Sequence, residues 1–593
     1  MKDFLKMSLA TVVGLIAFSA VSFVFSLIFL LGIATAFGGS EPKIASEGIL
    51  KVDMSTFILT EQSTESNPIE MISGGETMVG NIGIWDAVRS INAAANDPAV
   101  KFIYLLPDAV MGGTAQIEEF RAALQNFKNS GKAVISFIEN PTNAGYYLAS
   151  VSDKIYMTPY EGFMNNLTGV SSQMIFLKDI LDKIGINVQL IRHGKYKSAG
   201  EMFIRSTSSK ENLEQNEAMV KSVWESIGTS VAQSREISFE QLNSLLDNLS
   251  LNSAKDFIDN GLVDEALSRE ELGEKLATFY LADNADDLQY IPFTDYVTTK
   301  KTALNISDKK VAVIFADGNI VDGKEKQQVA GDHFASIISK IRKDPAVKAV
   351  VLRVNSPGGS VLASEKIKAE LDLLRENVPV IASYGAYAAS GGYWISACCD
   401  KIYTDATTLT GSIGVFSIIP DFGDAVKDKL HVTVTPVNSN THADMYNGFR
   451  ALTPAEAAYM QASVENIYKR FTSIVAEGRC MSVEQVDNLA QGRVWTGAEA
   501  VQIGLADEIG NIEDALKYAA FILNGNSDLS TIQVMEYPKP LTTVEMLVES
   551  LSGSKPSVFA GTPFENIETA FSTINATQTG KTYARLPYEY VIR

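Results

Sequence analysis

The sequence predicts an α/β protein made of two tandem copies of one domain, preceded by a single N-terminal transmembrane helix. Two observations predict this arrangement: short motifs that recur at one long offset, and an uncharged apolar stretch at the N-terminus. Short apolar runs also alternate with longer amphipathic stretches, a pattern typical of βαβ units. At 593 residues, of which 46% are hydrophobic and 20% charged, the chain can form several cores.

The N-terminal stretch is predicted to be an uncleaved membrane anchor. No charged residue occurs from Met7 to Ser40, and the segment from Leu9 to Phe37 is almost wholly apolar. A bilayer-spanning helix needs about 20 apolar residues, whereas a cleavable signal has an apolar region of about 7–15. Lys2 and Lys6 precede the stretch, which predicts a cytoplasmic N-terminus and, in a bacterium, a periplasmic main body anchored in the inner membrane. The alternative is a cleavable signal that is cut after the Ala34–Gly39 stretch.

An internal duplication is indicated by four pairs of matching motifs. The offset is 247 positions for the first two pairs and 242–243 for the others, which is far too long for a solenoid. The pairs are Asp97-Pro-Ala-Val-Lys101 with Asp344-Pro-Ala-Val-Lys348, Asp153-Lys-Ile-Tyr156 with Asp400-Lys-Ile-Tyr403, Leu167-Thr-Gly169 with Leu409-Thr-Gly411, and Gly261-Leu-Val-Asp-Glu265 with Gly504-Leu-Ala-Asp-Glu508.

Four segments follow from the anchor and the repeats. They are the anchor at 1–45, a first α/β repeat at 46–297, a second at 308–525 and a C-terminal extension at 526–593 without a counterpart in the first copy. In the second copy the pattern predicts strands at 311–315, 349–354 and 380–383, and helices near 333–342 and 362–375.

Composition excludes several classes of function. The net charge of −20 argues against non-specific nucleic-acid binding. The three cysteines, Cys398, Cys399 and Cys480, form no CxxC pair, and no two of the four histidines have metal-ligand spacing. No phosphate-binding Gly-x-x-x-x-Gly-Lys-Ser/Thr motif occurs, so no metal, nucleotide or other cofactor is expected.

Two glycine-rich motifs could carry chemistry. Asn355-Ser-Pro-Gly-Gly-Ser360 follows a predicted strand, and paired glycines let backbone N–H groups face a cleft where they can stabilise an oxyanion. Ser390 is followed by Gly391 and Gly392 just after another predicted strand, a setting that suits an exposed nucleophile. Read singly, each motif fits a plain turn or a capped helix equally well.

Together these motifs, about 30 residues apart, resemble those of Clp-type proteases and crotonases. With Leu409-Thr-Gly-Ser412-Ile-Gly-Val415 they are more similar still to the signal peptide peptidase A family in its long, duplicated form, over roughly residues 1–525. The resemblance implies two tandem Clp/crotonase-like domains and a Ser-Lys dyad. It makes Ser390 the nucleophile, and Gly359 and Gly391 the oxyanion-binding residues.

The general base that the resemblance implies is Lys197, in Gly194-Lys-Tyr-Lys197-Ser-Ala199, with Ser412 orienting it. Lys195 is the nearest rival, and a histidine base would have to be His431 or His442, which lie outside these motifs. Free lysine has a pKa near 10.4, so Lys197 must be buried to act as a base at neutral pH. We expect that burial where the two repeats meet.

The repeat divides the chemistry between the copies. Alignment places Asn143 opposite Ser390, Val170 opposite Ser412, and Thr441 opposite Lys197. The first copy therefore keeps the lysine and lacks the serine, and the second copy does the reverse. We predict that neither copy works alone; whether the two residues meet within one chain or between chains is left open.

The resemblance implies a serine endopeptidase that degrades cleaved signal peptides in or at the membrane. It also implies contact with inner-membrane lipid and assembly into a homotetramer. Two alternatives remain: a crotonase-like acyl-CoA enzyme, which leaves the Lys197 motif and the anchor unexplained, and a non-catalytic membrane scaffold. Cleavage specificity and the role of the 526–593 extension are not predicted.

Overall fold

The computed structural model describes residues 14–15, 18–19, 21–22, 44–64, 79–301, 307–326, 328–540 and 581–586. Nearly all of the predicted anchor, 1–45, lies outside these ranges. Within them, no helix combines the length and the apolar character needed to cross a bilayer. The anchor therefore stays a prediction.

The first half of the chain forms a parallel sheet with the strand order β8-β6-β5-β4-β1-β9. Its strands are β1 (Gly48–Asp53), β4 (Val100–Leu106), β5 (Val134–Ile138), β6 (Lys154–Met157), β8 (Glu265–Ala266) and β9 (Tyr290–Pro292). The accompanying helices are α3 (Ile84–Asn96), α4 (Thr114–Lys128), α5 (Asn143–Ala149), α8 (Lys210–Ser234), α9 (Phe239–Asp247), α10 (Ala254–Asp259), α11 (Arg269–Tyr280) and α12 (Phe293–Lys301). A separate pair, β2 (Phe57–Thr60) and β3 (Gly80–Gly83), leads into α3.

The second half repeats this plan in a larger sheet of order β19-β17-β15-β13-β10-β21, in which β16 also pairs with β15, and β20 pairs with β16. Its strands are β10 (Lys310–Asp317), β13 (Val347–Ser356), β15 (Val380–Ala389), β16 (Lys401–Thr404), β17 (Leu409–Gly411), β19 (Val494–Thr496), β20 (Glu508–Ile509) and β21 (Gln533–Tyr537). Its helices are α13 (Gly331–Lys343), α14 (Val361–Arg375), α15 (Gly391–Ser396), α16 (Pro454–Gly478), α17 (Val483–Leu489), α18 (Gly497–Gln502) and α19 (Ile512–Asn524). The strands and helices predicted for this copy are all present.

The matching motifs occupy matching places in the two halves. Asp97 and Asp344 end α3 and α13, and Lys154 and Lys401 begin β6 and β16. The two long helices α8 and α16 are each 25 residues long. β9 pairs with β1 as β21 pairs with β10, so part of the predicted extension, 526–593, completes the second sheet. The structure thus has the duplicated α/β plan that the repeats predict.

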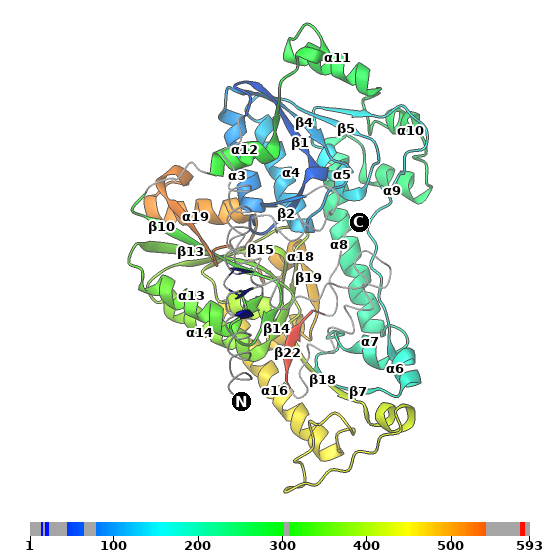
Figure 1. The fold of residues 1–593 in the computed structure, drawn as a ribbon, viewed down its shortest axis with the longest axis vertical. Coiled ribbons are helices and arrows are strands. Elements are labelled where there is room, and N and C mark those ends of the chain that lie inside the picture. The colour runs from blue at the N-terminus through cyan, green and yellow to red at the C-terminus, as the bar shows by residue number, and fades with distance from the viewer. Residues whose placement is uncertain are drawn as a thin grey trace.

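The two halves share one hydrophobic core. Along β10, Val311 and Val313 face the core that contains α3, α4 and α19, whereas Ala312 and Ile314 face α13 and α14. This alternation is what a strand buried on both faces requires. Figure 1 shows α3 and α4 of the first half above this sheet, and α13 and α14 on its other side.

A buried ion cluster also joins the halves. Arg353 on β13 lies 2.6 Å from Glu61 and 2.6 Å from Glu119, and all three side chains are at most 1% exposed. The two carboxylates come from the first half and the guanidinium from the second. Because buried charges are costly unless paired, this cluster favours one fixed docking of the halves.

A third sheet, of order β12-β11-β14-β22-β18-β7, crosses from one half to the other. β7 (Asn187–His193) belongs to the first half and runs antiparallel to β18 (Val415–Asp421) of the second. The sheet also contains β11 (Ile320–Val321), β12 (Val329–Ala330), β14 (Gly358–Ser360) and β22 (Tyr583–Arg585). Helices α6 (Lys178–Ile184) and α7 (Glu201–Ile204) flank β7. This crossing carries the segment after β7 into the second half.

Candidate active site

Ser390 stands at a sharp turn between β15 and α15. Its backbone has φ 55° and ψ −110°, a conformation that residues with a side chain rarely adopt. Such strain costs about 1–3 kcal/mol and must be held by its surroundings. The Ser390 N–H donates to the Gly411 carbonyl at 2.8 Å, and the Ser390 carbonyl accepts from the Trp394 N–H at 2.8 Å. The turn therefore fixes the hydroxyl at the start of a buried helix.

Lys197 reaches the same point from the other half of the chain. It follows β7 by a few residues, and the β7–β18 pairing brings it beside the end of β17. The Tyr196 N–H donates to the Gln491 carbonyl at 2.9 Å. A Cβ on Gly492 would lie 2.6 Å from the Lys197 backbone nitrogen, so only glycine allows this close approach.

The structure brings Lys197, Ser390 and Ser412 together within one chain. Lys197 Nζ lies 2.8 Å from Ser390 Oγ, 2.9 Å from Ser412 Oγ and 3.0 Å from the Ser412 carbonyl oxygen. All three side chains are fully buried. The expected burial of Lys197 at the junction of the repeats is observed.

The electrostatics of this site favour a neutral lysine. Burial away from water holds the pKa of Lys197 well below its usual range. None of the three atoms that Nζ contacts belongs to a carboxylate. A neutral amine has two N–H donors and one lone pair, so it can donate both protons to Ser412 and accept the Ser390 hydroxyl proton. The site thus offers one partner for each of the two N–H groups and one for the lone pair.

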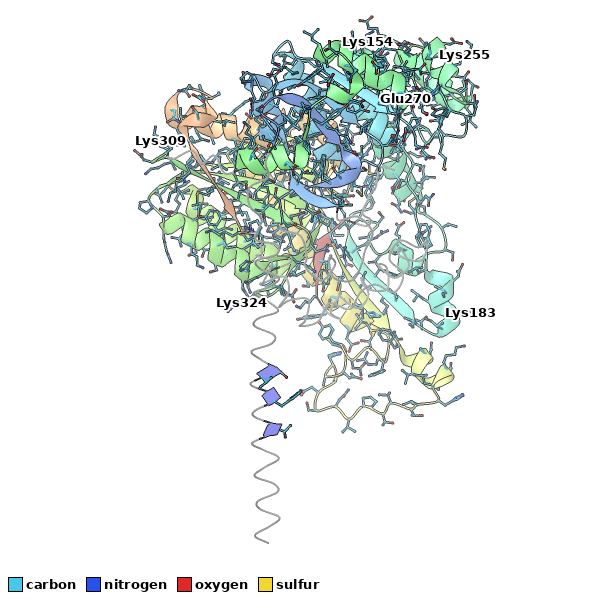
Figure 2. All side chains as sticks on the ribbon, turned by 45° about the horizontal axis from the view of Figure 1, so that its top comes forward. Lys154, Lys183, Lys255, Glu270, Lys309 and Lys324 are labelled. Carbon is cyan, nitrogen blue, oxygen red and sulfur yellow. The ribbon has the colours of Figure 1, made fainter. Side chains whose placement is uncertain are left out.

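Figure 2 shows where other lysines of this protein lie: Lys154, Lys183 and Lys255 are at the periphery. The side chain of Lys255 is 77% exposed, against none for Lys197. The rival base, Lys195, is also exposed and lies over the Tyr196 ring at 5.0 Å. His442 binds Glu456 at 2.9 Å, and the exposed His431 lies in the segment after β18. The amine beside Ser390 is that of Lys197.

Gly359 and Gly391 approach each other next to Ser390. A Cβ on Gly391 would lie 3.1 Å from the Gly359 nitrogen and 2.9 Å from Ser364 Oγ. Gly358, with φ 99°, makes the turn that presents β14 to this point. A Cβ there would lie 2.7 Å from the Gly391 nitrogen. The backbone nitrogens of Gly359 and of Gly391, the residue after Ser390, therefore lie close together.

The aligned positions of the first copy have different roles. The Asn143 side chain accepts from the N–H groups of Thr168 and Gly169, at 3.1 and 2.9 Å, and donates to the Gly169 carbonyl at 3.0 Å. It therefore holds the loop that matches Leu409-Thr-Gly411. Val170 is half-buried and packs against the shared core, and Thr441 is exposed. The first copy retains the scaffold, with an amide where the second has a hydroxyl.

Sequence reasoning missed the residues that hold Lys197 in place. Arg192 donates to the Lys197 carbonyl at 2.7 Å and to Glu201 Oε1 at 3.0 Å. Glu201 is fully buried and also accepts from the Ser209 N–H at 3.2 Å. A carboxylate four residues after the lysine was the available signal, but its contact with Arg192 depends on the turn at 194–200.

Within the described ranges, no cluster of side chains is suited to a metal ion and the cysteines form no disulfide bond. There, no three histidine, cysteine, aspartate or glutamate side chains gather as they would around a metal ion. Cys398 and Cys399 are buried free thiols, and Cys480 is an exposed one.

Comparison with known proteins identifies the family. The model of peptidase family S49 matches residues 126–304 and 372–524. Protease 4 of Haemophilus influenzae is 34% identical over 83% of this chain and 82% of its own, and Protease 4 of Salmonella typhi is 35% identical over 90% and 87%. A putative signal peptide peptidase SppA of Enterococcus faecium is 35% identical over 42% of this chain and 72% of its own.

A solved structure, a ClpP1 N165D mutant from Listeria monocytogenes, aligns with 34% of this chain and 93% of its own at 14% identity, with a TM-score of 0.23 that is too low to bear on the fold. The Clp/crotonase-like description of each domain therefore stays a prediction. The family model, in contrast, matches both halves, in keeping with the duplication, and the relatives align with most of the chain. This chain belongs to peptidase family S49 and is a serine peptidase.

Proposed function

We propose that this protein is a membrane-anchored endopeptidase that degrades signal peptides left in or at the membrane, with Ser390 as nucleophile and Lys197 as general base. The observation that carries the proposal is the 2.8 Å contact between Lys197 Nζ and Ser390 Oγ in a site closed to water. A lysine whose charged form is disfavoured by burial can accept a proton at neutral pH.

The reaction is acyl transfer in two steps. Lys197 Nζ takes the Ser390 proton while Oγ attacks the peptide carbonyl, and the N–H groups of Gly359 and Gly391 hold the resulting oxyanion. Lys197 then gives this proton to the leaving amine as the C–N bond breaks. Water, activated by the same amine, hydrolyses the ester and restores the Ser390 hydroxyl. Ser412 orients Nζ throughout, because it accepts both remaining N–H groups.

Apolar peptides suit the surroundings of this site. Met219, Leu409 and Val494 form a buried apolar cluster with Ala389, the residue before the nucleophile. A small apolar cavity beside the cluster is lined by Val220 and Tyr387, among others. Together with the uncharged stretch 7–40 and the likeness to a putative signal peptide peptidase, this cluster supports membrane-derived apolar peptides as substrates.

Location and assembly complete the proposal. The anchor would hold the catalytic part on the periplasmic side of the inner membrane, against lipid, and four copies would assemble. Protease protection of the catalytic part in spheroplasts, compared with intact cells, tests the location. Mass measurement of the detergent-solubilised protein tests the tetramer, and a monomeric mass would reject it.

The substrate class is tested with the full chain in lipid vesicles. A synthetic signal peptide is added alongside a soluble unfolded protein of similar length, and fragments are followed by mass spectrometry. We expect preferential cleavage of the signal peptide within its apolar region, and none with Ser390→Ala. Equal cleavage of both substrates would reject signal peptides as the substrate class, while leaving the peptidase itself intact.

A further inference from the structure

Two buried carboxyl groups meet where α4 of the first half packs against the second half. Glu119, on α4, is 1% exposed, and Asp405, the residue after β16, is 4% exposed. The two side chains lie in hydrogen-bonding contact with each other. Because one carboxyl comes from each half of the chain, this contact belongs to the junction that also holds the active site.

The contact between Asp405 and Glu119 requires a proton. An ionised carboxylate only accepts hydrogen bonds, so two ionised carboxylates side by side have no donor between them. Within the residues that the structure describes, no hydrogen-bond donor reaches Asp405 Oδ2 or Glu119 Oε2. A buried acceptor without a donor is costly, whereas one proton between the two groups makes a strong O–H···O⁻ hydrogen bond.

The neighbouring charges place this proton on Asp405. Arg353 lies 2.6 Å from Glu119 and 2.6 Å from Glu61, so its guanidinium already serves two carboxylates. Burial, followed by repulsion from Glu119 and Glu118, raises the pKa of Asp405 well above its usual range. Burial raises the pKa of Glu119 too, but Arg353 counteracts that rise. Asp405 is therefore the donor and Glu119 the acceptor.

The other ionisable side chains that face Asp405 are Glu118 of α4, Tyr147 of α5 and Arg353 of β13. Glu118 can stay ionised, because it accepts from the N–H groups of Ala406 and Thr407 at 3.1 Å each and from Thr407 Oγ1 at 2.8 Å. An ionised Asp405 would add a further carboxylate to those that already share the one guanidinium.

The loop 405–408 leads directly to the catalytic residues. Thr408 Oγ1 donates to a carbonyl of β15 at 2.8 Å, and β17 follows at once. The carbonyl of Gly411, at the end of β17, accepts the Ser390 N–H at 2.8 Å. Ser412 is the next residue along the chain. A shift of this loop away from α4 would therefore move the support of both serines.

The first copy has no equivalent of this pair. The offset of 247 positions that relates Asp153 to Asp400 places Thr158 opposite Asp405. The carboxyl group is thus specific to the second copy, at the place where that copy meets α4 of the first.

We propose that Asp405 is a neutral carboxylic acid at neutral pH, and that the proton it shares with Glu119 is a pH-sensitive contact between the two halves beside the active site. At alkaline pH this proton passes to water, and two buried carboxylates are left to repel each other. Such repulsion separates the loop 405–408 from α4. Peptide hydrolysis should therefore fall on the alkaline side of the rise that Lys197 produces.

The proton also makes stability depend on pH. The folded protein holds it, whereas an unfolded aspartate, with a pKa of about 3.9, has lost it at neutral pH. Between 3.9 and the raised pKa of folded Asp405, the folded state binds one more proton than the unfolded state. Stability therefore falls as pH rises through this window.

The test compares the wild type with Asp405→Asn, whose amide can donate to Glu119 but cannot ionise. Urea unfolding is measured at pH 5, 6, 7 and 8. We expect the unfolding equilibrium constant of the wild type, relative to the variant, to rise about tenfold per pH unit while Asp405 stays protonated. Lys197 contributes equally to both proteins and cancels. Asp283→Asn makes the same chemical change at an exposed site after α11, and it should run parallel to the wild type.

Infrared spectra detect the proton directly. The difference spectrum between the wild type and Asp405→Asn at pH 7 should contain a carboxylic-acid C=O band, and the one with Asp283→Asn should not. In a peptide assay of the same samples, Asp405→Asn should stay active to higher pH than the wild type. Asp405→Thr, which carries the residue found at position 158 of the first copy, is the second non-ionisable variant if Asp405→Asn does not fold.

The opposite results would overturn the inference. A stability difference that is constant from pH 5 to 8, or a difference spectrum without the acid band, would show that Asp405 is ionised in the folded protein. Alkaline loss of activity at the same pH in wild type and variant would reject the link to hydrolysis. The unfolding and infrared measurements do not depend on the proposed peptidase, so inactivity of every sample would reject that function and not the shared proton.

Discussion

Replacing Lys197 with methionine tests whether the amine is neutral in the folded protein. Because burial lowers the pKa of Lys197 in the folded state, the unfolded chain binds one more proton between that lowered pKa and about 10.4. Stability rises with pH wherever the unfolded state binds more protons. The free energy of unfolding of the wild type should therefore rise, relative to Lys197→Met, by up to about 1.4 kcal/mol per pH unit in this window.

The pH dependence of the difference in unfolding free energy between the two proteins is more informative than the size of that difference at one pH. Methionine removes the bonds of Nζ to the hydroxyls of Ser390 and Ser412, which costs about 1–3 kcal/mol for a buried group left without a partner. That cost does not depend on pH in this range, since serine does not titrate. Below the lowered pKa both states carry the proton, and the difference between the two proteins should be flat.

The assay is urea unfolding of both proteins at pH 7, 8, 9 and 10, followed by circular dichroism. Lys195→Met is the matched control, because Lys195 is an exposed lysine two residues away, over the Tyr196 ring. We expect the control to run parallel to the wild type at every pH. A Lys197→Met curve that is also parallel would show that the lysine is charged in the folded state, and it would refute the proton-acceptor role.

Three further changes have defined outcomes. Ser412→Ala removes one acceptor of the Lys197 amine, and steady-state kinetics should show kcat lowered about 10–100-fold with KM little changed. Gly391→Ala crowds the proposed oxyanion site, and kcat should fall about 10²–10³-fold while the circular dichroism spectrum is retained. Arg353→Leu leaves the buried Glu61 and Glu119 unpaired, and urea unfolding should show about 3–5 kcal/mol lost.

Much of the fold followed from local sequence patterns. The repeats gave the duplication because each copy keeps its motifs at the same helix ends and strand starts, as at Asp97 and Asp344. The pairing of β7 with β18 of the second half could not be predicted. Pairing between strands that are far apart in the chain produces no repeated motif in the sequence. It is the β7–β18 pairing that decides that Lys197 meets Ser390 within one chain.

The candidate site was predictable only in part for a similar reason. Paired glycines and a serine that follows a predicted strand can be recognised in the sequence, so Gly359, Gly391 and Ser390 could be named. The roles of Arg192 and Gly492 depend on contacts between segments far apart in the chain. The place of β22 depends on a segment of the extension that has no counterpart in the first copy.

The most direct test of the dyad is the pH dependence of peptide hydrolysis between pH 6 and 10. Short fluorogenic peptides with a small or aliphatic residue before the cleaved bond are given to the wild type, Ser390→Ala and Lys197→Ala. We expect no activity in either variant, and a wild-type kcat/KM that rises with pH around a midpoint well below the free-lysine pKa of about 10.4. Activity that survives in Lys197→Ala, or a midpoint near that of free lysine, would contradict the Ser390–Lys197 mechanism.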